Sequence, residues 1–417
     1  MFVKPMFRTA LLATALTGLI SVPQTGLAGQ TVVRSKDGKA AEKPEEKSRF
    51  TISGWVEGGF TGNFASPVDN QNFGRLFDDR SNEPLMNQFV LTFERMLDPK
   101  AKGFDWGFKA QAMFGTDARF IHSLGLLDKA MKTNIYQPDV VEAYLNLHFP
   151  ILTEGGVDLK LGKFVTLEGA ETIDPRSNVF YSHSYIFNYG IPFNHTGALF
   201  TVHATKVLDI YAGITRGVNT SIEDNNSAPA FHGGFGLNFN DGKFVVSATT
   251  HIGPETPDNS RGLRYLSDIT ATWKINDKLT SITDLNYIYD EAADARGYGV
   301  AQYLTYAFND KLSAGIRAEV WRDEKGFYVG QFADVHDPVR ALRGQTITDP
   351  RTVGGGNTTY GAITAGVTFK PSMPKPFSGL MIRPEFRVDS ALNNTRPFND
   401  SSDRTMFTAA IDFILQF

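Results

Sequence analysis

From about residue 49 onward, apolar and polar residues alternate along the chain in segments of roughly ten residues. The last segment, "TMFTAAIDFILQF" at 405–417, shows the pattern most clearly. Every second residue from Phe407 to Phe417 is apolar, and Thr408, Asp412 and Gln416 lie among the residues between them. A period of two places successive side chains on opposite faces of a β-strand. The pattern therefore predicts strands with one apolar and one polar face.

The alternation recurs often enough to predict an all-β chain of about sixteen strands. Fourteen and eighteen strands are the alternatives. Eighteen would result if the stretch "FYVGQFADV" at 327–335 added strands within the long connection before residue 358. The predicted strands lie near 49–63, 86–96, 104–117, 140–150, 156–166, 195–204, 208–218, 231–240, 243–253, 261–276, 279–290, 295–309, 312–324, 358–371, 380–390 and 405–417.

The connections between these segments are mostly long and short in turn. Three short ones carry related motifs, "FNDGKF" at 239–244, "INDKL" at 275–279 and "FNDKL" at 308–312. Asn, Asp and Gly favour tight hairpin turns, and the spacing of two strands plus one loop puts the three turns on one rim. Short periplasmic turns, long outer loops and an even strand number are typical of outer-membrane barrels. We therefore expect residues 49–417 to form a single transmembrane antiparallel β-barrel.

Aromatic residues close several predicted strands at the rim of the short turns. They are Phe149, Phe239, Phe308, Phe369 and Phe417. Aromatic girdles lie at the boundary between lipid and water in such barrels. An extracellular β-sandwich that binds a ligand would also alternate, and it remains an alternative at this stage.

The amino terminus predicts export. Lys4 and Arg8 precede an apolar run from Ala10 to Val22, and small residues follow up to Ala28, so residues 1–28 are expected to be a signal peptide. Residues 29–48 are charged and lack a period, which predicts a disordered periplasmic lead-in. Removing the signal peptide would change the net charge from −4 to about −6, which argues against a nucleic-acid partner. The chain has no cysteine, so no disulfide can stabilise it.

A longer stretch between residues 157 and 226 carries a family resemblance. In order it contains "LGKF", "EGAE", "FYSHSY", "PFNHTG", "YAGITRGVN" and "DNN". This order resembles the OmpL-like β-barrel porin family of Gram-negative outer membranes. Thr220 and Ser221 follow Asn219 where family members often have Gly-Trp. The resemblance implies a pore in the outer membrane and names no substrate.

A barrel of about sixteen strands is wide enough for a water-filled channel, whose chemistry is set by the inward side chains. Any single one of these charges can equally serve only to solvate the wall. The charged residues at inward positions of the alternation are Glu57, Glu94, Asp105, Lys109, Glu142, Asp158, Lys160, Asp209, Arg264, Asp268, Lys274, Asp284, Arg317, Glu319, Arg383, Glu385, Arg387, Asp389 and Asp412.

The long connection at 167–194 is the candidate constriction. Four of its charged residues are Glu168, Glu171, Asp174 and Arg176, and the aromatic residues that follow include Phe180, Tyr181, Tyr185, Phe187 and Tyr189. We expect it to fold into the lumen and to place its acids across from Arg317, Arg383 and Arg387, with Glu319 and Glu385 on the same wall. Rings of charge at a constriction select ions through their field. The alternative is a loop that only covers the rim.

Signatures of catalysis and metal binding are missing from the sequence. No His-Glu-x-x-His motif, phosphate loop or Gly-x-Ser-x-Gly elbow occurs, so no metal or other cofactor is expected. Ser182 beside His183 is the one arrangement that would suit an outer-membrane phospholipase. Neighbouring side chains in a strand or loop usually point apart, which disfavours it.

The sequence therefore predicts a porin of the cell outer membrane that passes small hydrophilic solutes or ions by diffusion. The second candidate is a channel selective for sugars or peptides, with the aromatic residues of 167–194 as a stacking track. The expected partners are outer-membrane lipid, lipopolysaccharide and the barrel assembly machinery, which reads carboxy-terminal aromatic residues such as Phe417. A homotrimer is one arrangement; the sequence leaves the subunit number open.

Overall fold

The structure is a computed structural model of the 417-residue chain. It describes residues 49–98, 101–131, 134–329, 339, 342–344 and 356–417. The expected signal peptide at 1–28 and the lead-in at 29–48 lie outside the described residues, as do residues 330–335 of the stretch considered for further strands.

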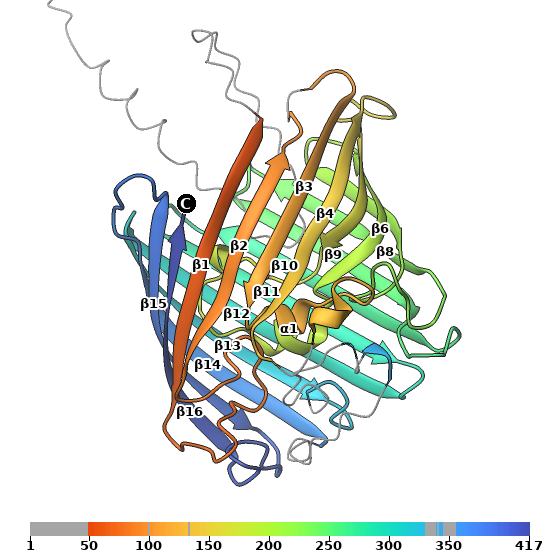
Figure 1. Ribbon diagram of the computed structural model, residues 1–417. Coiled ribbons are helices and arrows are strands. Elements are labelled where there is room, and N and C mark those ends of the chain that lie inside the picture. Colours follow the sequence, from red (N-terminus) through yellow and green to blue (C-terminus); the bar gives the residue numbers. More distant parts are fainter. Residues whose placement is uncertain (1–48, 99–100, 132–133, 330–338, 340–341, 345–355) are drawn as a thin grey trace, which may run out of the picture.

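Sixteen antiparallel strands form one closed barrel, in which each strand pairs with its neighbours in sequence and the last pairs with the first (Figure 1). The strands are β1 (Phe50–Asn63), β2 (Pro84–Arg95), β3 (Asp105–Gly115), β4 (Gln137–Phe149), β5 (Val157–Val165), β6 (Asn194–His203), β7 (Leu208–Thr215), β8 (Ala230–Phe239), β9 (Phe244–Pro254), β10 (Leu263–Lys274), β11 (Leu279–Asp290), β12 (Ala295–Asn309), β13 (Leu312–Asp323), β14 (Thr358–Phe369), β15 (Gly379–Ala391) and β16 (Thr405–Gln416). The predicted fold class and strand number are confirmed, and the closed ring excludes fourteen and eighteen strands.

The two ends of the chain meet at the seam of the barrel. The ladder between β1 and β16 runs from Trp55 opposite Gln416 to Asn63 opposite Thr408. Beyond it, the Gly54 N–H donates to the Phe417 carbonyl and the Phe417 N–H donates to the Gly54 carbonyl, each at 3.0 Å. Because no strand edge is left open, the backbone can cross hydrocarbon with its polar groups paired.

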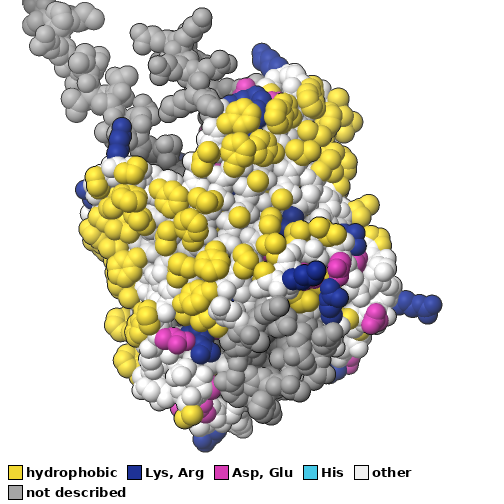
Figure 2. All heavy atoms as spheres, in the orientation of Figure 1, with side chains coloured by type: hydrophobic (Ala, Val, Ile, Leu, Met, Phe, Trp, Pro, Cys, Tyr) yellow, Lys and Arg dark blue, Asp and Glu magenta, His cyan; other side chains and the backbone are white. Residues whose placement is uncertain are grey.

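Alternation divides the side chains between lumen and outer surface as predicted. On β10, Asp268 and Thr270 are 1% and 3% exposed, whereas Ile269 and Trp273 are 44% and 52% exposed. Figure 2 shows hydrophobic side chains over the wall of the barrel and charged ones mainly toward its two ends. No helix of the described residues is long and apolar enough to span a membrane.

The three Asn-Asp motifs form short turns at the rim where the carboxy terminus lies. At the first, Asn240 and Asp241 adopt left-handed backbone angles, each with φ of 53°, which these residues tolerate. At the second, Asn276 acts through its side chain, because Oδ1 accepts hydrogen bonds from the Lys278 and Leu279 N–H groups. Asn309 accepts in the same way from Lys311. One sequence motif thus stabilises its turns by two different mechanisms.

The opposite rim carries the long connections, and some of these fill the lumen. Loop L1 (residues 64–83) buries Leu76 and Phe77, each 1% exposed, and the short helix α1 (Ala118–Ile121) is buried throughout. Arg75 of L1 lies 2.6 Å from both Asp78 and Asp389, so it ties the loop to β15. The sequence did not predict this inward folding of L1 and α1.

Candidate functional site

Loop L3 (residues 166–193) joins β5 to β6 and lies inside the barrel. It contains a 3₁₀ turn, η2 (Pro175–Ser177), and a π-helical turn, η3 (Ile186–Gly190). Most of its side chains are buried, and Glu168, Ser182 and Tyr185 have no exposed surface. L3 bonds to β10–β13 and β15, and it also bonds to β2, where Gln88 donates to the Ile173 carbonyl at 2.9 Å. L3 is therefore a fixed part of the interior.

Arg317 of β13 is the centre of the first contact between L3 and the wall. Its guanidinium lies 2.7 Å from Glu171 of L3, 2.8 Å from the Ser182 carbonyl and 3.0 Å from Glu319. Burial opposes ionisation of Glu171, but Arg317 and hydrogen bonds from His183 and the Ser184 N–H outweigh it and lower its pKa to about 2. The pair is therefore ionised and holds L3 against β13.

Two arginines of β15 make the second contact. Arg383 bonds Asp412 at 2.5 Å and donates to the Pro175 and Asn178 carbonyls of L3, each at 2.8 Å. Arg387 bonds Asp389 at 2.7 Å and donates to the His183 carbonyl at 2.5 Å. Both side chains are at most 2% exposed. These arginines face L3 and not an open passage.

The two wall glutamates bind the backbone of L3. Glu385 accepts from the Tyr181 N–H at 2.8 Å and the Ser182 N–H at 3.2 Å. Glu319 accepts from the Tyr185 N–H at 2.7 Å. The three arginines and two glutamates that were predicted to lie across from L3 therefore all contact it, but they hold its chain in place.

The other predicted charges of L3 lie apart from the wall arginines. Asp174 pairs with Arg176 at 2.6 Å, and the Arg176 guanidinium lies 4.0 Å from the centre of the Trp55 ring. Neither carboxylate oxygen of Glu168 has a hydrogen-bond partner in the described part of the chain. Burial and the nearby charge of Asp268 raise its pKa well above the ordinary value. Of the three acids, the structure brings only Glu171 to a predicted wall arginine.

The aromatic side chains of L3 named above are buried, and Ser182 and His183 hydrogen-bond to residues that hold L3 in place. Phe180, Tyr181, Tyr185, Phe187 and Tyr189 are at most 6% exposed, and of these five rings only that of Phe187 borders the cavity described next. Ser182 Oγ bonds Arg317, whereas His183 Nδ1 bonds Glu171, so the two side chains serve different partners. Within the described residues, no group of three His, Asp or Glu side chains is arranged to hold a metal ion.

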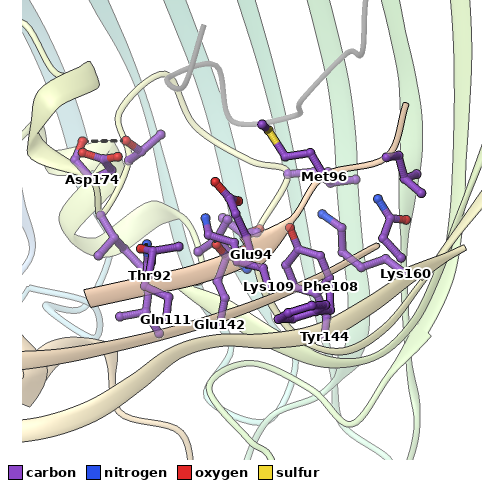
Figure 3. A pocket seen from close by; sticks show the side chains of 18 of the residues that line it. Thr92, Glu94, Met96, Phe108, Lys109, Gln111, Glu142, Tyr144, Lys160 and Asp174 are labelled. Carbon is purple, nitrogen blue, oxygen red and sulfur yellow. Dashed lines mark hydrogen bonds and ion pairs between the residues drawn. The ribbon is translucent and has the colours of Figure 1, made fainter. Parts of the chain in front are cut away.

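A cavity of about 620 Å³ lies on the other side of L3, between the loop and the wall of β2–β5. Figure 3 shows side chains from this wall, among them Glu94, Lys109, Tyr144 and Lys160, with Asp174 of L3 at one end. The lining extends to Asp98, His148 and His203 near the rim of the short turns. The alternation of apolar and polar residues predicted that Glu94, Lys109 and Lys160 face the lumen. It could not predict that the cavity would lie beside these residues.

A closed sixteen-stranded barrel with an inward-folded third loop and a charged cavity defines the class of outer-membrane porins. The chain belongs to the family described as "Putative beta-barrel porin-2, OmpL-like", whose model matches residues 49–417. It is therefore an outer-membrane channel protein, as predicted.

Solved structures similar to this chain are also outer-membrane proteins. OprB of Pseudomonas putida matches with a TM-score of 0.54 at 12% identity, over 88% of this chain and 94% of that one. The channel DcaP of Acinetobacter baumannii matches with a TM-score of 0.51 at 11% identity, over 88% and 96%. A trimer form of OmpT of Vibrio cholerae matches with a TM-score of 0.51 at 10% identity, over 88% and 99%. None of the curated proteins compared with the chain matches its sequence.

Proposed function

We propose that this porin passes small hydrophilic solutes or ions by diffusion along one side of the lumen, between L3 and the wall of β2–β5. The observation that carries the proposal is the asymmetry around L3. Its contacts with β13 and β15 bury Arg317, Arg383 and Arg387, whereas the cavity lies on the side of β2–β5. L3 acts as the constriction, with Asp174 and Arg176 lining the cavity and with Glu171, which also lines it, as the anchor to Arg317.

Cysteine accessibility tests this route, because the chain has no cysteine of its own. Asn146→Cys places a thiol in the cavity wall, and Thr364→Cys places one behind L3, where Thr364 is fully buried beside Arg317. In planar-bilayer recordings, a charged methanethiosulfonate should reduce the conductance of the Asn146 variant and leave that of the Thr364 variant unchanged. Block of the Thr364 variant alone would place the passage on the other side of L3.

A second candidate is a channel selective for sugars or peptides. The close packing of Phe180, Tyr181, Tyr185 and Tyr189 weighs against a stacking track along L3, and polar side chains in the cavity supply the alternative surface. Liposome swelling with neutral and charged solutes separates the two functions. A dependence on solute size alone favours general diffusion.

A non-enzymatic role fits the separate partners of Ser182 and His183. A phospholipase assay on the detergent-solubilised protein tests it, because hydrolysis that disappears in Ser182→Ala would establish an enzyme.

The proposal also includes export through a signal peptide at 1–28, followed by a disordered lead-in at 29–48. In it, the assembly machinery recognises Phe417 and the barrel contacts lipopolysaccharide. A homotrimer is the proposed assembly, by analogy with the trimer form of OmpT.

A further inference from the structure

Besides Glu168, which is fully buried, two side chains of opposite charge line the cavity without a strong partner. On β5, Lys160 has no carboxylate within ion-pair distance in the described part of the chain, and its ammonium lies 4.6 Å from the centre of the Tyr144 ring. On β2, Glu94 has no ion pair among the described residues and accepts one long hydrogen bond, from Thr51 at 3.4 Å.

The other cations of the cavity are already neutralised. Lys109 pairs with Glu142, and Arg176 pairs with Asp174. Arg49 and Arg95 at the rim both bond Asp105. An incoming anionic group would therefore meet Lys160 as the available cation of this wall.

Neutral hydrogen-bonding groups lie close to Lys160. Asn146 is directly opposite Lys160 in the ladder between β4 and β5, and Tyr144 precedes it on the same face of β4. Within the described chain, neither the Asn146 amide nor the Tyr144 hydroxyl makes a hydrogen bond, and both residues line the cavity. An ammonium, an amide and a hydroxyl are together the donors that a carboxylate requires.

The spacing of the two unpaired charges indicates the size of the ligand. Glu94 lies opposite Lys109 on β3, and Lys109 lies opposite Tyr144 on β4, so Glu94 and Lys160 are three strands apart. Lys160 is also two residues along β5 from the position opposite Tyr144. At about 4.8 Å per strand and about 3.3 Å per residue, the backbones of Glu94 and Lys160 are separated by roughly 16 Å, which the two side chains shorten. An extended tripeptide spans about 10 Å. In Figure 3 the Lys109 and Tyr144 side chains lie between those of Glu94 and Lys160.

We propose that this wall binds a short zwitterionic peptide, with its carboxylate at Lys160 and Asn146 and its ammonium at Glu94. The proposal rests on the route assigned above and adds a ligand class to it. Ile173, Ile191 and Phe193 of L3 also line the cavity and limit the water that screens the two charges. A channel site must still release its ligand, so we expect weak binding.

Triglycine is the probe, applied from the side of the short turns in single-channel recordings. We expect concentration-dependent interruptions of the ionic current in the wild-type protein. Lys160→Met and Glu94→Gln should each weaken triglycine binding about tenfold, because each removes one charged contact. Acetate should lose affinity only in the Lys160 variant, and ethylammonium only in the Glu94 variant. Lys206→Met, on the exposed β6–β7 turn, is the matched control and should change nothing.

The outcomes separate the binding site from the channel function. A conducting channel whose triglycine binding is the same in wild type and both variants overturns the binding site and leaves the proposed function standing. Acetate or ethylammonium binding as tightly as triglycine also overturns it, because the two ends would then not act together. Calorimetry with the detergent-solubilised protein measures the same affinities without conductance. A failure of the diffusion function therefore still leaves the peptide site testable.

Discussion

At the scale of single residues, the interior is held by arginines that bridge wall and loop. Arg75, Arg317, Arg383 and Arg387 are at most 2% exposed, and each bonds at least one carboxylate. A buried pair of this kind adds little net stability compared with an apolar pair, but removing one partner leaves an uncompensated charge. These residues therefore specify where L1 and L3 lie more than they stabilise the barrel.

Replacing Arg387 tests this cost. Arg387→Met leaves Asp389 with Arg75 and the Tyr185 hydroxyl and takes a donor from the His183 carbonyl. Because Asp389 keeps one cationic partner, we expect a loss below the roughly 3–5 kcal/mol of a fully broken buried pair. When samples are heated to increasing temperatures before electrophoresis, the band of the folded barrel should disappear at a clearly lower temperature for this variant than for wild type. Lys206→Met removes a cation from an exposed turn and should leave that temperature unchanged. Equal temperatures for the two variants would contradict the anchoring role.

Glu171 should make the attachment of L3 depend on pH. Its pKa in the folded protein is about 2, below its ordinary value of 4.5, so the stabilisation is complete above about pH 4.5 and is lost as the pH falls toward 2. The difference between these two pKa values corresponds to about 3 kcal/mol of folding free energy. Unfolding temperatures measured between pH 5 and pH 2.5 should fall less steeply in Glu171→Gln than in wild type. Parallel curves would show that Glu171 does not control this transition.

At the scale of elements, the strands were predictable and the folded loops were not. A strand such as β10 can be predicted from the sequence because its residues from Asp268 to Thr272 face lumen and lipid in turn. The apolar and polar residues of the sequence therefore alternate with a period of two. L1 and L3 carry no period. Their positions depend on partners far away in sequence, such as Arg75 with Asp389 or Glu171 with Arg317.

Shortening L3 tests its role as the constriction. Deleting residues 168–176 removes Glu171 and the contact of Pro175 with Arg383, and it opens the space next to β2–β5. Single-channel conductance should rise. Deleting residues 257–261 from the largely exposed β9–β10 loop is the control and should leave conductance near the wild-type value. An unchanged conductance after the deletion in L3 would mean that the loop does not limit flow.

At the scale of the whole molecule, stability depends on closing the ring at β1 and β16. Gly54 sits at this seam, where an added Cβ would lie 2.4 Å from the Val90 carbonyl and 2.7 Å from the Phe417 ring. Gly54→Val should therefore reduce the yield of folded barrel on refolding into detergent. Gly103→Val, at a turn where a Cβ meets nothing within 4 Å, is the matched control. Similar yields would show that the seam tolerates a side chain.

The sequence by itself determined the class of fold, because lipid outside and water inside impose an alternation that each strand must satisfy alone. It therefore predicted the strands, the rim of short turns and the inward charges such as Lys109 and Lys160. Only the tertiary structure decided which side of the lumen L3 closes. That outcome depends on which buried charges find partners, and strands distant in the chain, such as β13 and β15, supply those partners.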